Sequence, residues 1–161
     1  MTNVFLCSFA SPDLNLSVSR FKKQSKELNF YKGIKIFGWK NLSYEKQKQI
    51  SLFFQKGEKR LYGYSSWKPE IILSYLNEIP KDSILQYSDI GCHFNHKGIK
   101  RLNDYIQITN KNNMLSFKYN KPNFDLKENF KFQIYYEYQY TKADSWKYLK
   151  INSDSEILKT E

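Results

Sequence analysis

Ser88-Asp89-Ile90-Gly91 contains residues that could bind a ligand. It follows 84–87, a short and mostly apolar segment that we predict to be a strand buried on both faces. Open α/β sheets bind ligands just beyond the carboxyl ends of such strands. The carboxylate of Asp89 is therefore a candidate ligand-binding group.

A second candidate group combines aromatic rings with positive charge. Tyr62 and Tyr64 flank Gly63 and follow two cations at 59–60. Such rings can stack on a base, and such cations can neutralise a diphosphate. The alternative is that the tyrosines belong to the core and the cations are solvated. Lys68, at the start of a predicted helix, is a candidate for binding phosphate.

Cys92, His93 and His96 follow Asp89 closely enough to suggest zinc. A structural zinc site needs four ligands, normally supplied as two separated pairs. Cys7 is the only other cysteine and there is no third histidine, so the sequence lacks a second pair. The histidines are then either loop residues beside a sugar-phosphate site or ordinary surface residues.

Alternation of strands and helices predicts an α/β fold with a mainly parallel sheet flanked by helices, in a single domain covering 1–161. A strand, a helix that we expect Ser17 to cap, and a second strand fill the first 37 residues, which suggests a parallel crossover unit. The predicted strands lie near 4–8, 34–37, 84–88, 115–119 and 130–140. The predicted helices lie near 17–28, 43–55, 67–77, 97–106 and 141–148.

Two blocks carry a resemblance to a known family. Residues 63–73, GYSSWKPEIIL, followed by residues 84–92, ILQYSDIGC, resemble a family of bacterial glycosyltransferase-like proteins with the GT-A fold of nucleotide-diphospho-sugar transferases. The segment 141–161, TKADSWKYLKINSDSEILKTE, resembles a later part of the same family. The resemblance therefore covers nearly the whole chain and implies a GT-A, Rossmann-like fold.

The resemblance also implies a donor site. The first strand-to-helix loop would hold the nucleotide base, although without the resemblance this loop is an ordinary connection. Asp89 would hold the donor ribose or a divalent cation, Mn²⁺ or Mg²⁺. GT-A enzymes usually carry Asp-x-Asp here, and Gly91 stands in place of the second acid, which weakens the case for a metal. The implied donor-binding residues are Phe9, Ala10, Ser11, Tyr62, Tyr64, Lys68, Asp89 and Gly91, and no catalytic residue is identified.

The function implied by the resemblance is transfer of a sugar from a nucleotide diphosphate to a glycan or glycolipid acceptor during lipooligosaccharide or capsule assembly. Such an enzyme would work in the cytoplasm, at the inner face of the cytoplasmic membrane. Only about 70 residues follow Asp89, whereas GT-A acceptor sites usually come from this half. We therefore expect the N-terminal portion of a longer enzyme, or a naturally shortened and inactive relative. A truncation predicts an exposed apolar patch near Trp146 and 130–140.

Composition favours an alternative class. The net charge is +10, as expected for a non-catalytic basic module that binds an anionic glycan, a membrane surface or RNA. The same lysine and asparagine content is expected from an AT-rich genome. Arginine, the residue suited to bidentate base and phosphate recognition, occurs only at 20, 60 and 101, so a specific nucleic-acid reader is not expected. Two cysteines without a disulfide framework indicate a reducing compartment.

Overall fold

The chain divides into two compact units, Met1–Asn113 and Met114–Glu161. The computed structural model describes residues 2–59, 61–115, 117–118 and 158–159. In the second unit the described residues form strands β4 (Phe117–Lys118) and β5 (Leu158–Lys159), which pair antiparallel. The prediction that a strand at 115–119 joins the parallel sheet is therefore wrong, because this segment pairs with β5 instead. The predicted strand 130–140, the predicted helix 141–148 and the patch near Trp146 lie outside the described residues.

Three parallel strands form the sheet of the first unit. They are β1 (Val4–Phe9), β2 (Gly33–Phe37) and β3 (Ile84–Tyr87), in the order β2-β1-β3. Leu6 of the central strand lies opposite Ile34 on one side and Gln86 on the other. The α/β class with a parallel sheet is confirmed, and the order predicts a ligand site between the carboxyl ends of β1 and β3.

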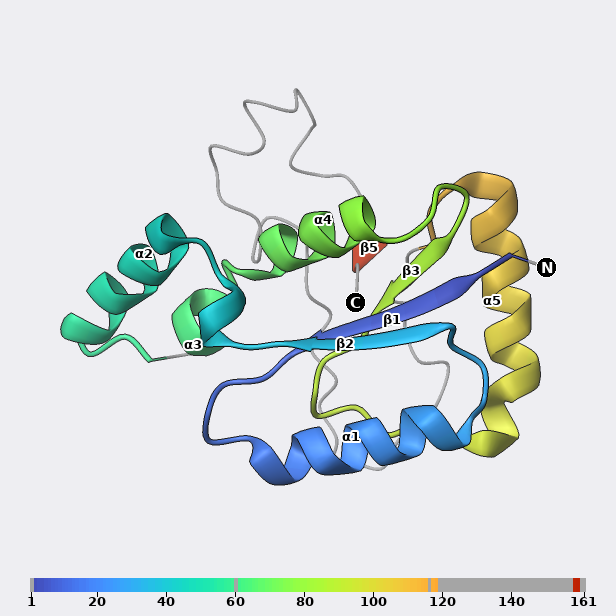
Figure 1. The fold of residues 1–161 in the computed structure, drawn as a ribbon, viewed down its shortest axis with the longest axis horizontal. Helices are drawn as coiled ribbons and strands as arrows, with labels where there is room; N and C mark the ends of the chain where they lie inside the picture. The colour runs from blue at the N-terminus through green and yellow to red at the C-terminus, as the bar shows by residue number, and fades with distance from the viewer. Residues whose placement is uncertain (1, 60, 116, 119–157, 160–161) are drawn as a thin grey trace, which may run out of the picture. The chain divides into compact units, whose positions relative to one another are not determined.

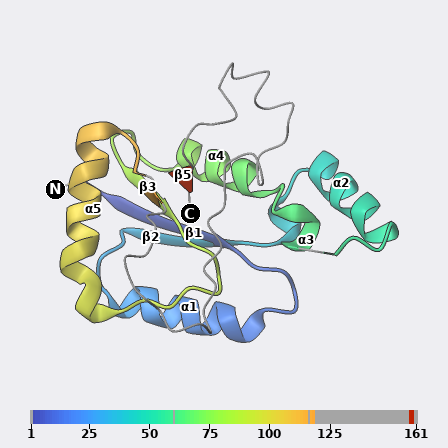
Figure 2. The ribbon, with the colours of Figure 1, turned by 180° about the vertical axis from the view of Figure 1, so that it is seen from behind.

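Helices cover both faces of the sheet. Helix α1 (Asn15–Glu27) lies on one face and α4 (Lys68–Glu78) on the other, as both views show (Figures 1 and 2). Helix α5 (Ile99–Asn112), preceded by the 3₁₀ turn η2 (His96–Gly98), contacts β3. The prediction that Ser17 caps this helix is wrong. Ser17 lies inside α1, and Leu14 is the N-cap residue, because a turn from Ser11 already directs the chain into the helix.

The connection from β2 to α4 holds three short elements. These are the 3₁₀ turn η1 (Trp39–Asn41), helix α2 (Tyr44–Gln55) and the turn α3 (Leu61–Tyr64). Ser43 caps α2, since its Oγ accepts a hydrogen bond from the Lys46 amide at 3.3 Å. The carboxylate of Glu70 accepts bonds from the Ser43 amide and hydroxyl at 2.6 and 3.1 Å, which ties α2 to α4.

The α3 turn is left-handed. All five residues from Leu61 to Ser65 have positive φ, between 48° and 81°. Outside glycine, this conformation costs about 1–2 kcal/mol per residue and rarely occurs in runs. Gly63 is the one glycine of the run, and a Cβ built there would lie 2.8 Å from Cγ1 of Ile50. The turn therefore needs glycine both for its φ of 81° and for its close approach to α2.

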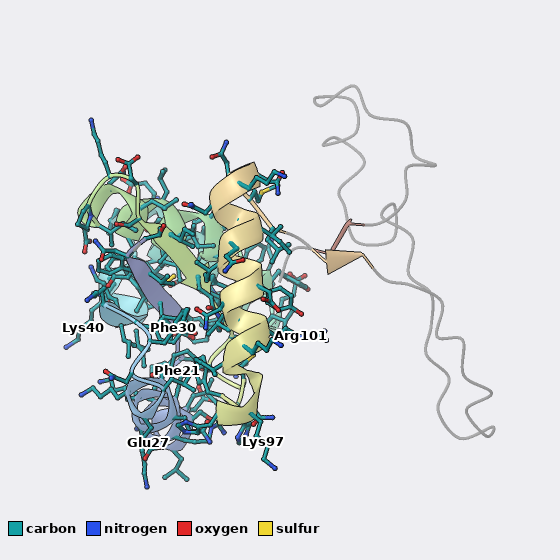
Figure 3. The ribbon with its side chains drawn as sticks, turned by 90° about the vertical axis from the view of Figure 1, so that its right-hand side faces the viewer. Phe21, Glu27, Phe30, Lys40, Lys97 and Arg101 are labelled. Carbon is teal, nitrogen blue, oxygen red and sulfur yellow. The ribbon has the colours of Figure 1, made fainter. Side chains whose placement is uncertain are left out.

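Alternate residues of β1 enter two separate cores. Cys7 and Phe9 pack toward α4, whereas Leu6 and Ala10 pack toward α1. On the α1 side Phe21 is fully buried, and Figure 3 shows it on the side of the helix that faces the sheet. Because both of its faces are buried, the central strand β1 is a fixed support for the loops at the carboxyl edge of the sheet.

Candidate functional site

A groove of about 580 Å³ opens at the carboxyl edge of β1 and β2. It does not lie between β1 and β3, where the strand order predicts a ligand site. The loop after β1 contributes Ala10 and Ser11, and η1 contributes Trp39. An adjoining hollow of about 470 Å³ shares Ser11 and Tyr62 with it and adds Asp13 and Lys59. Two of the three loop residues predicted to hold a base, Ala10 and Ser11, therefore line this groove.

Three aromatic side chains form one wall of the groove. Tyr62 meets Phe54 edge-to-face with ring centroids 5.1 Å apart, and meets Trp39 in the same way at 5.9 Å. All three rings are partly buried, so part of each stays accessible. Burial, and to a smaller degree the charge of Asp13, raises the pKa of the Tyr62 hydroxyl, which therefore remains a hydrogen-bond donor near neutral pH. Such a wall offers stacking and one polar contact to a flat ring.

Positive charge surrounds this wall. Lys22 from α1 and Lys40 from η1 line the groove, and Lys59 lines the adjoining hollow. All three lysines are exposed, and Lys40 projects outward in Figure 3. Their long side chains can reach a phosphate, with an attraction that salt will screen. The amide of Asn41 also lines the groove, and its Oδ1 accepts a hydrogen bond from Gly38 at 2.8 Å.

The left-handed α3 turn places Tyr62 in this wall. Tyr62 itself has φ 51° and ψ 59°, a conformation that tyrosine rarely adopts. Strained backbone of this kind persists where its surroundings hold it and clusters at functional sites. The two tyrosines of the turn diverge: Tyr64 packs edge-to-face on Phe53 at 5.6 Å and is 49% exposed, and it is not among the groove residues. Of the two tyrosines predicted to flank a ligand, only Tyr62 lines the groove.

A second polar cluster lies at the end of β3. Nζ of Lys68 lies 3.4 Å from Oδ1 of Asp89 and 4.6 Å from the centroid of the Tyr87 ring. The Tyr87 hydroxyl donates a hydrogen bond to the same carboxylate oxygen. Burial, together with this hydrogen bond and the charge of Asp89, raises the pKa of Tyr87, so the hydroxyl keeps its proton. The side chain of Asp89 is 63% exposed and remains open to a ligand.

An aromatic row connects the cluster with the groove. Phe9 stacks on Trp67 with centroids 3.9 Å apart, and it also meets Tyr62 at 5.7 Å. Trp67 in turn lies 6.4 Å from Tyr87. Phe9 is only 4% exposed, so its ring supports the groove from beneath and does not line it.

Gly91 has no structural need for glycine. It is exposed, and a Cβ built there would meet nothing within 4 Å. Its φ does not lie in the left-handed region. Among the residues that the sequence assigned to a donor site, three lie in neither the groove nor the cluster: Phe9, Tyr64 and Gly91.

Arg20 is a site residue that sequence reasoning missed. Its Nη2 donates hydrogen bonds to the carbonyl oxygens of Ile90 at 2.8 Å and Cys92 at 3.4 Å. Nearby, the Phe94 amide donates to Oε1 of Gln24 at 3.3 Å. Helix α1 thus holds the loop that carries Asp89. No local sequence pattern distinguishes Arg20 from the neighbouring Lys22 and Lys23, which are exposed.

The residues around Asp89 do not fit a resident divalent cation. The ammonium of Lys68 already occupies the place beside the carboxylate where a cation would lie. In the described part of the chain, no three His, Cys, Asp or Glu side chains gather as metal ligands would. Mg²⁺ and Mn²⁺ favour several oxygen ligands, and a single paired carboxylate offers little.

Comparison of the chain with protein-family models, with curated proteins and with solved structures gave no match. None of the helices in the described ranges is both long and apolar enough to cross a bilayer. Function must therefore be argued from the groove, the Asp89 cluster and the sequence resemblance.

Proposed function

We propose that this chain binds a nucleotide-diphosphate sugar and belongs to a glycosyltransferase of the GT-A type that acts on a surface glycan, in lipooligosaccharide or capsule assembly. The observation that carries the proposal is the groove itself. It lies at the carboxyl edge of a parallel sheet, where α/β proteins bind nucleotides, and it combines an aromatic wall with lysines. The assignment to GT-A rests on the sequence resemblance, and the choice of acceptor is fold-level analogy.

In this proposal the base stacks against Trp39 and Tyr62. The backbone of Ala10 and Ser11 and the amide of Asn41 supply hydrogen-bonding groups along the groove. Aromatic stacking tolerates any base, so these polar groups would select among bases. The volume of about 580 Å³ lies within the range of small-molecule sites.

The lysines of the groove would meet the diphosphate. When a sugar is transferred, the bond between its anomeric carbon and the diphosphate breaks, and negative charge grows on the departing oxygen. Fixed positive charge near that oxygen lowers the barrier. Lys22, Lys40 and Lys59 are the lysines that line the two hollows. The exposed carboxylate of Asp89 would accept a hydrogen bond from a hydroxyl of the donor.

Calorimetric titration with UDP and with other nucleoside diphosphates tests this proposal. Replacing Tyr62 by Ala should weaken binding by about 1–3 kcal/mol, the usual worth of one base-stacking ring. Tyr64→Ala is the matched control, since Tyr64 belongs to the same turn but not to the groove. Equal losses in both variants would mean that the turn matters only for folding. No binding of any nucleoside diphosphate by the folded wild-type chain would refute the proposal.

A second candidate function is supported by the outer surface of α2 and α3. Leu52, Leu61 and Tyr64 are between 49% and 63% exposed. The exposed Lys48 lies on the same helix as Leu52, and the exposed Lys56 directly follows that helix. Apolar groups flanked by lysines suit an anionic membrane surface. On this basis we propose, as the alternative, that the chain is a non-catalytic basic module that binds an anionic membrane surface. An anionic glycan or RNA are the other ligands of such a module. Contact with the inner face of the membrane is compatible with both proposed functions.

Co-sedimentation with vesicles separates the two candidates. A basic module should bind phosphatidylglycerol-containing vesicles, bind neutral phosphatidylcholine vesicles poorly, and lose most binding as salt rises. A nucleotide held in the groove by stacking should respond less to salt. Leu52→Glu should reduce vesicle binding and leave nucleotide binding unchanged, because Leu52 lies on α2 but outside the groove. Vesicle binding that is indifferent to lipid charge and to this variant would contradict the second candidate.

A further inference from the structure

Lys68 takes the position beside Asp89 that a metal ion would take in a metal-dependent donor site. Its Nζ lies 3.4 Å from Oδ1 of Asp89 and also over the Tyr87 ring. Lys68 is the first residue of α4, and Pro69 follows it within the first turn. The start of the helix and the Tyr87 ring together restrict where the ammonium group can lie. The ion pair of Lys68 and Asp89 is thus part of the structure at the end of β3.

The charges at this position leave little room for a divalent cation. Asp89 carries one negative charge, and Lys68 already balances it. A divalent cation that approached Asp89 would face the ammonium at short range, where like charges repel strongly. Lys68 and Tyr87 both contact Oδ1, so only the second oxygen is open. Gly91 provides no second carboxylate to compensate.

The same arrangement of lysine, carboxylate and ring occurs elsewhere in the chain. Nζ of Lys35 lies 2.7 Å from Oε1 of Glu78 and 4.7 Å from the centroid of the Phe37 ring. Lys35 lines neither the groove nor the adjoining hollow. It therefore provides a control with similar local chemistry whose own side chain lies outside the groove, and its contact with the groove is indirect, through the Phe37 ring.

We infer that nucleoside diphosphate binding by this chain is independent of divalent cations, because the ammonium group of Lys68 neutralises and positions the carboxylate of Asp89. This inference rests on the proposed function. Lys68 cancels the charge of Asp89, so the carboxylate does not repel an incoming diphosphate. The lysines of the groove then neutralise the diphosphate itself. The cation that Asp89 was expected to hold is replaced by a side chain.

The test is a titration of UDP into the full chain, once with EDTA and once with Mn²⁺. Wild-type affinity should be the same within about twofold in both buffers, the usual margin for equal binding energies. Lys68→Met leaves Asp89 unpaired and negative. Its UDP affinity in EDTA should fall by about tenfold, roughly one pKa unit of charge interaction, and Mn²⁺ should restore much of it. Lys68→Arg should behave as wild type.

Two further variants separate this role from a structural one. Lys35→Met should bind UDP as wild type does in both buffers, since it removes an equivalent ion pair away from the groove. Lys68→Met combined with Asp89→Asn should lose the Mn²⁺ response, because the unpaired carboxylate is gone. A merely destabilised variant would not gain a metal response. Thermal unfolding of each variant checks that it is folded during the titration.

The outcomes are distinguishable. A wild-type chain that binds UDP only with Mn²⁺ would overturn the inference and leave the proposed function standing. The same holds if Lys68→Met binds UDP as wild type does and shows no Mn²⁺ response. If the folded wild-type chain binds no nucleoside diphosphate in either buffer, the proposed function fails, and the inference fails with it.

Discussion

The ring of Phe9 stacks on the indole of Trp67 with centroids 3.9 Å apart and planes inclined by 20°. Phe9 is the last residue of the central strand, and Trp67 directly precedes α4. Both are almost fully buried. The stack therefore closes the α4 side of the core at the carboxyl edge, directly beneath the groove and beside the Asp89 cluster.

Loss of this stack should destabilise the fold without acting on the groove directly. Trp67→Ala removes a buried aromatic side chain and should lower the free energy of unfolding by about 3–5 kcal/mol, measured by urea denaturation. Trp39→Ala is the matched control, because Trp39 is only partly buried and lines the groove. Trp39→Ala should lower the free energy of unfolding less than Trp67→Ala does, and it should weaken UDP binding more. The reverse ranking of the two variants would contradict the placement of these indoles.

The left-handed turn should depend on its glycine. Gly63→Ala forces a methyl group against Ile50 at a φ of 81°, so we expect a loss of about 2–4 kcal/mol of unfolding free energy from strain and overpacking together. Gly57→Ala has nearly the same φ, 79°, but meets no atom within 4 Å. It should cost only the backbone strain, about 1–2 kcal/mol.

A double variant isolates the contact between Gly63 and Ile50. Ile50→Ala removes Cγ1 and Cγ2, the two atoms that would lie closest to a methyl group at position 63. If the clash is real, the two losses should be less than additive, with a coupling of about 0.5 kcal/mol or more. Strict additivity would show that strain alone makes Gly63 necessary.

Arg20 should stabilise the loop that carries Asp89. Arg20→Ala removes the hydrogen bonds to the Ile90 and Cys92 carbonyl oxygens and should cost about 1.5–3 kcal/mol, as expected for bonds from a charged donor. Amide hydrogen exchange over 88–94 should become faster. Lys23→Ala, on the exposed face of the same helix and 4.0 Å from Glu27, should change stability by less than about 0.5 kcal/mol. Unchanged exchange in Arg20→Ala would mean that the helix does not hold this loop.

Stability should fall in alkaline solution. Burial raises the pKa of the Cys7 thiol from 9.0 to about 12, and it also raises the pKa of Tyr31 and Tyr87. Between about pH 9 and pH 12 the unfolded chain therefore binds fewer protons than the folded chain, and unfolding becomes easier as pH rises. Below pH 9 these groups are protonated in both states, and their contribution is constant.

The size of this dependence can be measured by denaturation at a series of pH values. Each such group should add a slope of about −1.4 kcal/mol per pH unit once its unfolded form ionises. Cys7→Ala should remove the loss of stability that begins near pH 9. The loss that the tyrosines cause, which begins near pH 10, should remain. A Cys7→Ala curve parallel to wild type over this range would show that the thiol is not held neutral by the fold.

Several features follow from the sequence alone. Apolar spacing indicates the helices, and short runs of strand-forming residues indicate β1, β2 and β3, because these patterns record which side of each element is buried. The α/β class then follows from their alternation along the chain. The position of Asp89 just after a short apolar strand likewise placed it at the carboxyl edge of the sheet. The prediction that this strand is buried on both faces is wrong, because β3 lies at the edge of the sheet and its four residues are only half-buried. These predictions depend on local order, which the sequence contains directly.

Other features were decided by the tertiary structure. Tyr62 and Tyr64 are two residues apart and look equivalent, but the left-handed turn directs only Tyr62 into the groove. Lys68 and Asp89 are 21 positions apart, and they meet because α4 crosses the sheet so that its first turn lies at the carboxyl end of β3. A lysine suited to phosphate and a carboxylate suited to a metal thus become partners of each other. Their charges cancel only when the fold brings them within 3.4 Å, and no local pattern in the sequence contains that distance.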